Sequence, residues 1–196
     1  MIKVGFVVEG VSDKKLIESA AFKDFAQQKC GLEILDEVVD AGGNKNMCSQ
    51  KIGIYVQKLM IQAQPDKIVV LADLDPEDCV LCITERKKII GNKDIDLVVI
   101  ARKAMESWFL ADTQAMRKWL EDDNFQLENP EETDEMPWDY IKELGKNSPK
   151  QRGPGSKKVF ARKFIRDYGF DVCRAAKHPN CQSSQYFIMK LFELAG

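Results

Sequence analysis

The alternation of buried strands with amphipathic helices constrains the fold of this chain more than any other feature of its sequence. Apolar residues recur at helical spacing after Ser12, over Ile52–Ala63 and up to about Ile90. Between these helices, short runs rich in β-branched and aromatic residues predict strands buried on both faces, at Ile2–Val8, Leu32–Val39, Ile68–Ala72 and Asp96–Ala101. This order predicts the α/β class: a Rossmann-like, three-layer α/β/α fold around a mainly parallel four-stranded sheet with right-handed crossovers.

The chain of 196 residues, 44% of them hydrophobic, is long enough to bury a sizeable core. Residues 1–120 are the predicted α/β domain. Helical spacing continues after the fourth strand through Ala104–Asp112, and Asp112 can cap a further turn that reaches Leu120. Residues 156–196 are expected to pack on the same domain as helices, at about 156–168 and 182–195.

Charge is distributed unevenly along the last 76 residues of the chain. Residues 121–141 carry nine acidic and no basic side chains, so we expect 121–155 to bury little and to form an acidic-to-basic excursion or linker. Residues 142–196 carry twelve basic and four acidic side chains. Such a patch can hold the phosphates of nucleic acid, with Lys157, Lys158 and Arg162 as candidate contacts, or it can form the solvated faces of helices.

No apolar run approaches the length of a membrane span, and the first residues lack the features of a secretion signal. Because disulfides are rare in proteins that are not exported, we interpret the six cysteines as reduced thiols of a cytoplasmic protein without a membrane partner. A zinc site is conceivable from ligands in distant segments, but buried thiols fit better; these residues are Cys79, Cys82, Cys173, His178 and Cys181.

Acidic residues follow two of the predicted strands. Glu9 follows the first strand, and Asp73 and Asp75 follow the third. Ligands of open parallel sheets bind beyond the carboxyl ends of the strands, and clustered carboxylates favour Mg²⁺ or Mn²⁺ as their counter-charge. The sequence therefore predicts a divalent-metal site at this edge. It requires that Glu9 face Asp73 and that no arginine or lysine fill the gap between them.

Other interpretations use the same residues. Asp75-Pro76-Glu77-Asp78 is also typical of a helix start, with an N-cap followed by proline and acids. Glu9-Gly10-Val11-Ser12-Asp13 does not match the Gly-x-Gly-x-x-Gly pattern of dinucleotide sites and places an acid where phosphate must approach, which disfavours both dinucleotide and P-loop binding. Asp73-Leu74-Asp75 also resembles the nucleophile motif of haloacid-dehalogenase-type phosphatases, which normally lies on the first strand.

Three segments together resemble a Toprim domain over roughly residues 1–120, namely Glu9-Gly10-Val11-Ser12-Asp13, Asp73-Leu74-Asp75 and the string Ala104-Met-Glu-Ser-Trp-Phe-Leu-Ala-Asp112. They resemble in particular a bacterial Toprim-like family of unassigned function that is related to the OLD nucleases. The resemblance implies that Glu9, Asp73, Asp75 and Glu106 are catalytic, that the first three bind Mg²⁺ or Mn²⁺, and that the reaction is phosphodiester hydrolysis of DNA or RNA. It also implies an ATPase partner protein in phage-defence loci.

Two departures from the Toprim pattern leave an alternative open. Pro76 stands where many Toprim motifs have a small residue, and it stiffens the turn. Glu106 lies off the stripe of Met105, Trp108 and Phe109, so it belongs either to the site or to a solvated helix face. The rival function is a non-catalytic Toprim-like protein that binds an ATPase or nucleic acid.

Overall fold

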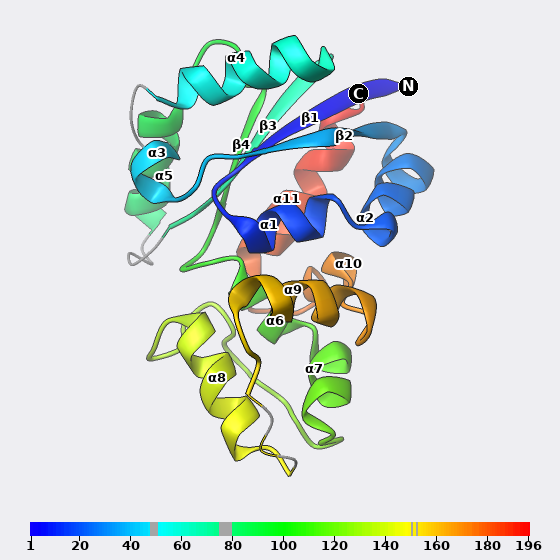
Figure 1. Ribbon diagram of the computed structural model, residues 1–196, viewed down its shortest axis with the longest axis vertical. Helices are drawn as coiled ribbons and strands as arrows, with labels where there is room; N and C mark the ends of the chain where they lie inside the picture. The colour runs from blue at the N-terminus through cyan, green and yellow to red at the C-terminus, as the bar shows by residue number, and fades with distance from the viewer. Residues whose placement is uncertain (48–50, 75–79, 150, 152) are drawn as a thin grey trace.

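A computed structural model describes residues 1–47, 51–74, 80–149, 151 and 153–196 (Figure 1). The described residues form one parallel sheet with strand order β2-β1-β3-β4, whose strands are β1 (Ile2–Val8), β2 (Leu32–Asp40), β3 (Lys67–Asp73) and β4 (Leu97–Ala101). Each strand overlaps its predicted range. The predicted α/β class with a parallel sheet of four strands is confirmed.

Helices cover both faces of the sheet, as the alternation predicts. Along β1, Val4, Phe6 and Val8 pack into one core and Val7 into the other, because successive side chains of a strand point to opposite faces. One face is covered by α3 (Asn44–Met47), α4 (Ile52–Ala63) and α5 (Val80–Ile90). The other is covered by α1 (Val11–Ile17), α2 (Ala20–Phe25) and a π-helical turn η1 (Ala26–Cys30), together with α11 (Gln182–Leu194) (Figure 1).

The chain after β4 forms a helical part that lies beyond one end of the sheet in Figure 1. It contains α6 (Glu106–Ala111), α7 (Thr113–Leu120), α8 (Pro137–Asn147), α9 (Lys157–Arg166) and α10 (Val172–Ala175). Helices α9 and α11 lie at the two positions predicted for C-terminal helices. Phe160 and Phe187 share one core cluster with Phe6 of β1, so these helices belong to the same folded unit.

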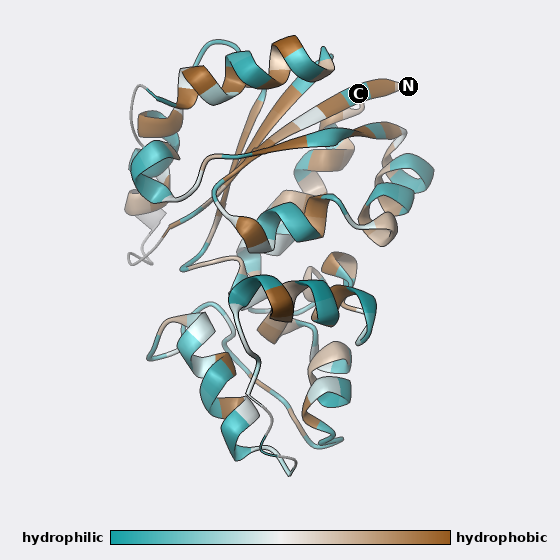
Figure 2. Cartoon of the chain, viewed as in Figure 1, coloured by the Kyte–Doolittle hydropathy of each residue, from teal (hydrophilic) through white to brown (hydrophobic). Residues whose placement is uncertain are grey.

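Aromatic side chains fill much of that core. Trp108 of α6 stacks on Phe187 of α11 with ring centroids 5.3 Å apart, and its indole N–H donates to Ser183 Oγ at 2.7 Å. Figure 2 shows apolar residues concentrated in the strands, whereas the helices carry both apolar and hydrophilic residues. No helix in the described part of the chain is long and apolar enough to cross a membrane.

The acidic segment is held more closely than its composition predicts. We expected 121–155 to bury little, yet Glu131 and Thr133 are buried and α8 lies within this range. The Glu131 carboxylate accepts the backbone N–H groups of Gln182 and Ser183, each at 3.0 Å, at the first turn of α11. A carboxylate satisfies the free N–H groups and the positive dipole end of a helix, which explains why this acid is buried.

Candidate active site

The ends of β1 and β3 bring two of the predicted acids together. Val8 pairs with Leu71 in the parallel register, and Glu9 continues the ladder by donating its N–H to the Leu71 carbonyl at 3.0 Å. Glu9 Oε2 then accepts the backbone N–H of Asp73 at 3.1 Å. Glu9 therefore faces the end of β3, as the sequence required, and it does so with its side chain buried.

The start of α6 reaches the same edge because the chain turns sharply after β4. Lys103 has φ of 60°, a left-handed conformation that is unusual for a residue with a side chain. The turn places the Met105 N–H 2.9 Å from Asp73 Oδ1, and Glu106 follows as the first residue of α6. Glu106 is only 2% exposed, so its alternative reading as a solvated helix face is wrong.

A fourth acid, Asp13, joins the cluster from the first turn of α1. Its Oδ2 accepts the Gly10 N–H at 3.0 Å, while its buried Oδ1 has no hydrogen-bond partner among the described residues. Ser12, beside it, donates Oγ to Glu106 Oε1 at 2.8 Å. We did not single out Asp13 from the sequence because an acid in a first helical turn has a sufficient local explanation. Asp13 lies only four residues after Glu9, across the turn at Gly10, and this spacing could have indicated that both acids lie at the same edge of the sheet.

These acids surround one cavity of about 310 Å³. Five acids and one basic residue line it: Glu9, Asp13, Asp73 and Glu106, the exposed Asp40 at the end of β2, and Lys157. The remaining lining residues are Gly10, Val11, Ser12, Gly42, Gly43 and Met105. The cavity thus lies beyond the carboxyl ends of the strands, where parallel sheets bind ligands.

Burial and mutual repulsion disfavour the charged forms of the acids. Burial is the main cause that raises the pKa of Asp13 well above its usual value, and the charges of Glu106 and Glu9 raise it further. Burial likewise raises the pKa of Asp73, followed by the charges of Asp13, Glu106 and Glu9. A cation placed between them would favour ionisation and lower both pKa values.

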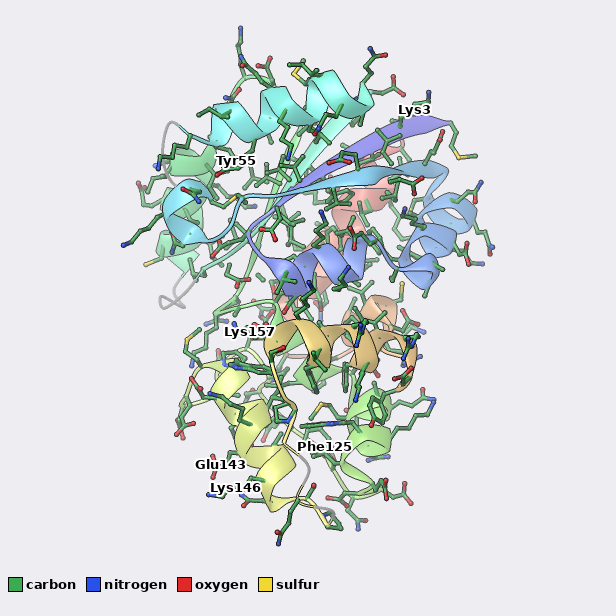
Figure 3. All side chains as sticks on the ribbon, in the orientation of Figure 1. Lys3, Tyr55, Phe125, Glu143, Lys146 and Lys157 are labelled. Atoms are coloured by element: carbon green, nitrogen blue, oxygen red, sulfur yellow. The ribbon has the colours of Figure 1, made fainter. Side chains whose placement is uncertain are left out.

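Two basic side chains already contact the cluster. Lys157 Nζ lies 3.3 Å from Glu106 Oε2, and Figure 3 shows it at the beginning of α9. Arg86 of α5 donates Nη2 to Glu9 Oε2 at 3.1 Å. The Asp73 N–H donates to the same Glu9 oxygen, and Arg86 is not among the residues that line the cavity.

The predicted trio of metal ligands cannot be examined in full, because Asp75 lies outside the described residues. In the parts of the chain that are described, no group of three or more His, Cys, Asp or Glu side chains is arranged to hold a metal ion, zinc included. The donor chemistry nevertheless fits a hard divalent cation, since the cavity offers carboxylate oxygens and one of them, Asp13 Oδ1, is buried without a partner.

The three basic residues predicted to bind nucleic acid are separated. Lys157 lines the acidic cavity, whereas Lys158 is exposed on α9. Arg162, one turn further along the same helix, lines a different cavity with Lys15 of α1 and Arg166. The four described cysteines, Cys30, Cys82, Cys173 and Cys181, are free thiols.

The fold and the site together define an α/β protein with an acidic cavity at the carboxyl edge of its parallel sheet. Comparison of the sequence with protein-family models and with characterised proteins finds no match. A solved structure similar to this chain is the C-terminal region of the Burkholderia pseudomallei OLD protein, with a TM-score of 0.49 and 15% sequence identity over 98% of this chain and 99% of that chain.

Proposed function

We propose that this chain is a divalent-metal-dependent phosphodiesterase that hydrolyses nucleic acid, of the Toprim type that its motifs resemble. One observation carries the proposal: the buried acids Glu9, Asp13 and Glu106 and the half-buried Asp73 line a single cavity. Burial and the charges of the neighbouring carboxylates raise the pKa of Asp13 and Asp73, so their ionisation lowers the stability of the fold. Strongly perturbed acids that converge in a cavity are typical of a functional site.

Mg²⁺ or Mn²⁺ bound in this cavity would polarise a phosphoryl oxygen and lower the pKa of a bound water. Asp73 and Asp13, with Asp75 from the sequence motif, are the residues that would hold the ion. The Asp73 N–H and Arg86 orient the Glu9 carboxylate, which would serve as a second-metal ligand or as the general base that takes the proton of the attacking water. Glu106, held by Ser12, completes the acidic wall.

The substrate in this proposal is nucleic acid. Lys157 is the cation that lines the acidic cavity, where it can bind the phosphate that is cleaved. Lys158 and Arg162 are four residues apart on α9, and both are exposed, so they lie on one face of that helix and can bind further phosphates. Association with an ATPase partner in phage defence belongs to the same proposal and is carried only by the family resemblance.

Cleavage assays test this function directly. Purified protein is incubated with plasmid, single-stranded DNA and tRNA in Mn²⁺, Mg²⁺ or EDTA. We expect cleavage with the metals and none in EDTA. Asp73→Asn and Glu9→Gln should abolish it with the circular dichroism spectrum intact, whereas Asp24→Asn, at an exposed acid on α2, should cleave like the wild type. Equal cleavage in EDTA, or by both site variants, would contradict the proposal.

A second candidate is a non-catalytic Toprim-like binding protein. The pairing of Glu9 with Arg86 favours it, because an internal cation already neutralises one of the acids that a metal would need. In that case, calorimetry with Mg²⁺ and Mn²⁺ would detect no binding to intact protein.

A further inference from the structure

Arg86 of α5 forms a buried ion pair with Glu9, one of the acids that line the cavity. The side chains of Arg86 and Glu9 are each 10% exposed, and the guanidinium Nη2 lies 3.1 Å from Glu9 Oε2. On its other branch, Nη1 donates to Asn44 Oδ1 at 2.6 Å. We propose that Arg86 is a positioning residue for the cation site, which fixes Glu9 and, through Asn44, the loop after β2; this inference rests on the proposed function.

The first step concerns Glu9 itself. Its Oε2 atom receives both the Asp73 N–H and Arg86 Nη2, so these two donors fix the orientation of the carboxylate at the end of β1. A buried carboxylate that loses its paired cation is strongly disfavoured in its original position. Arg86 thus keeps the Glu9 carboxylate turned toward the end of β3.

The second step concerns the loop between β2 and α3. Gly42 and Gly43 have φ of 74° and 112°, and the Gly43 N–H donates to the Glu9 carbonyl at 2.8 Å. Asn44 follows at the start of α3. Since Asp40, Gly42 and Gly43 line the acidic cavity, the Arg86–Asn44 bond fixes one wall of that cavity relative to Glu9.

The two contacts require the shape of arginine. A planar guanidinium directs separate N–H groups at two acceptors, whereas the single ammonium of lysine sits at one point and cannot reproduce that fork. Arg86→Lys therefore keeps the charge and removes the bridge. Groups that orient a metal ligand typically change metal affinity by roughly 10–100-fold when they are replaced.

Mn²⁺ binding measured by electron paramagnetic resonance tests the inference without any substrate. We expect Arg86→Lys to weaken Mn²⁺ binding by roughly 10-fold or more, and Asn44→Ala to weaken it in the same direction by less. Because Arg86 acts mainly through Glu9, the double variant Arg86→Lys/Glu9→Gln should lose less Mn²⁺ affinity than the product of the two single losses, and the loss beyond that of Glu9→Gln should not exceed that of Asn44→Ala. A merely structural role would instead make the two losses multiply.

Arg174→Lys is the matched control, because Arg174 also forks onto a buried acid, Asp112, away from the cavity. We expect it to lower the unfolding temperature and leave Mn²⁺ affinity unchanged. Wild-type affinity in Arg86→Lys, or multiplying losses in the double variant, would overturn the inference while the proposed function stands. Absence of Mn²⁺ binding to the wild type would overturn both. Thermal unfolding in EDTA measures the contact between Arg86 and Glu9 without metal. If the two residues contact each other, the stability losses of Arg86→Lys and Glu9→Gln should not add in the double variant, whether or not the wild type binds Mn²⁺.

Discussion

Lys157 Nζ lies 3.3 Å from Glu106 Oε2, and this contact joins the beginning of α9 to the first residue of α6 at the acidic cavity. Burial works to lower the pKa of the Lys157 ammonium, but the nearby charges of Glu106 and Asp73 outweigh it and raise the pKa. The ammonium is thus held in its charged form by the acids around it. The basic C-terminal segment therefore supplies part of the candidate site as well as surface charge.

Replacing Lys157 by alanine should destabilise the metal-free protein, because Glu106 then keeps Ser12 but loses its contact with a cation. Lys157 is 43% exposed in its side chain, so the ion pair contributes no more than about 1 kcal/mol. Thermal unfolding in EDTA at pH 7 should then show a decrease of roughly 2–4 °C. The control is Lys158→Ala, at the adjacent exposed lysine, which should leave the unfolding temperature unchanged. Equal effects of the two variants would show that the ion pair of Lys157 with Glu106 does not stabilise the fold.

The pH dependence of stability should reveal the strained acids. An acid whose folded pKa is raised binds its proton more tightly in the folded state, so the free energy of unfolding falls as the pH rises from the unfolded pKa toward the folded one. Asp13 and Asp73 both have raised pKa values, mainly through burial. Metal-free wild-type protein should therefore lose stability as the pH rises above about 4, the unfolded pKa of an aspartate, and should continue to lose it up to the raised folded pKa values of Asp13 and Asp73.

Asp13→Asn removes one of these titrations. Its unfolding temperature in EDTA should decline less than that of the wild type between pH 4 and pH 8, so that the difference between the curves grows with pH in favour of the variant. Adding Mn²⁺ should reduce the decline in the wild type, because a bound cation lowers the pKa of the acids. If the unfolding temperatures of variant and wild type instead change in parallel with pH, the pKa of Asp13 is not raised in the folded protein.

Sequence reasoning located the acids that local patterns mark and missed the contacts that only tertiary structure creates. Glu9 and Asp73 follow from strand periodicity, because parallel strands end at one edge of the sheet. Asp112 was predicted as a helix cap, and its Oδ1 does accept the Ala115 N–H at 3.2 Å. Arg86 lies on an ordinary amphipathic helix, 77 residues from its partner Glu9, and no local pattern distinguishes it from a surface arginine.

Removing the Asp112 carboxylate should cause a large loss of stability. Asp112 is 1% exposed, caps α7 and pairs with both Nε and Nη2 of Arg174, at 3.0 and 2.8 Å. Arg174 is 31% exposed in its side chain and also pairs with Asp171, so loss of the helix cap and of the charged hydrogen bonds together costs about 2–4 kcal/mol. Urea unfolding of Asp112→Ala should show a decrease of this size, while Asp167→Ala, at an exposed pair with Arg166, should change stability by less than about 1 kcal/mol.

Glu131 should be the residue that holds the acidic segment against α11. Its carboxylate accepts the N–H groups of Gln182 and Ser183, and the Lys103 ammonium adds a second attachment by donating to the Thr133 carbonyl. Glu131→Ala leaves two helix-end donors without their acceptor, and each donor left unsatisfied in a buried position costs about 1–3 kcal/mol.

The expected result of Glu131→Ala is a lower unfolding temperature together with faster proteolysis within 121–136, because the segment loses its buried attachment while Lys103 retains the other. Asp134→Ala, three residues further along and exposed, is the matched control and should match the wild type in both measurements. If Glu131→Ala lowers the unfolding temperature but the segment stays as resistant to protease as in the wild type, then Lys103 rather than Glu131 holds the segment in place.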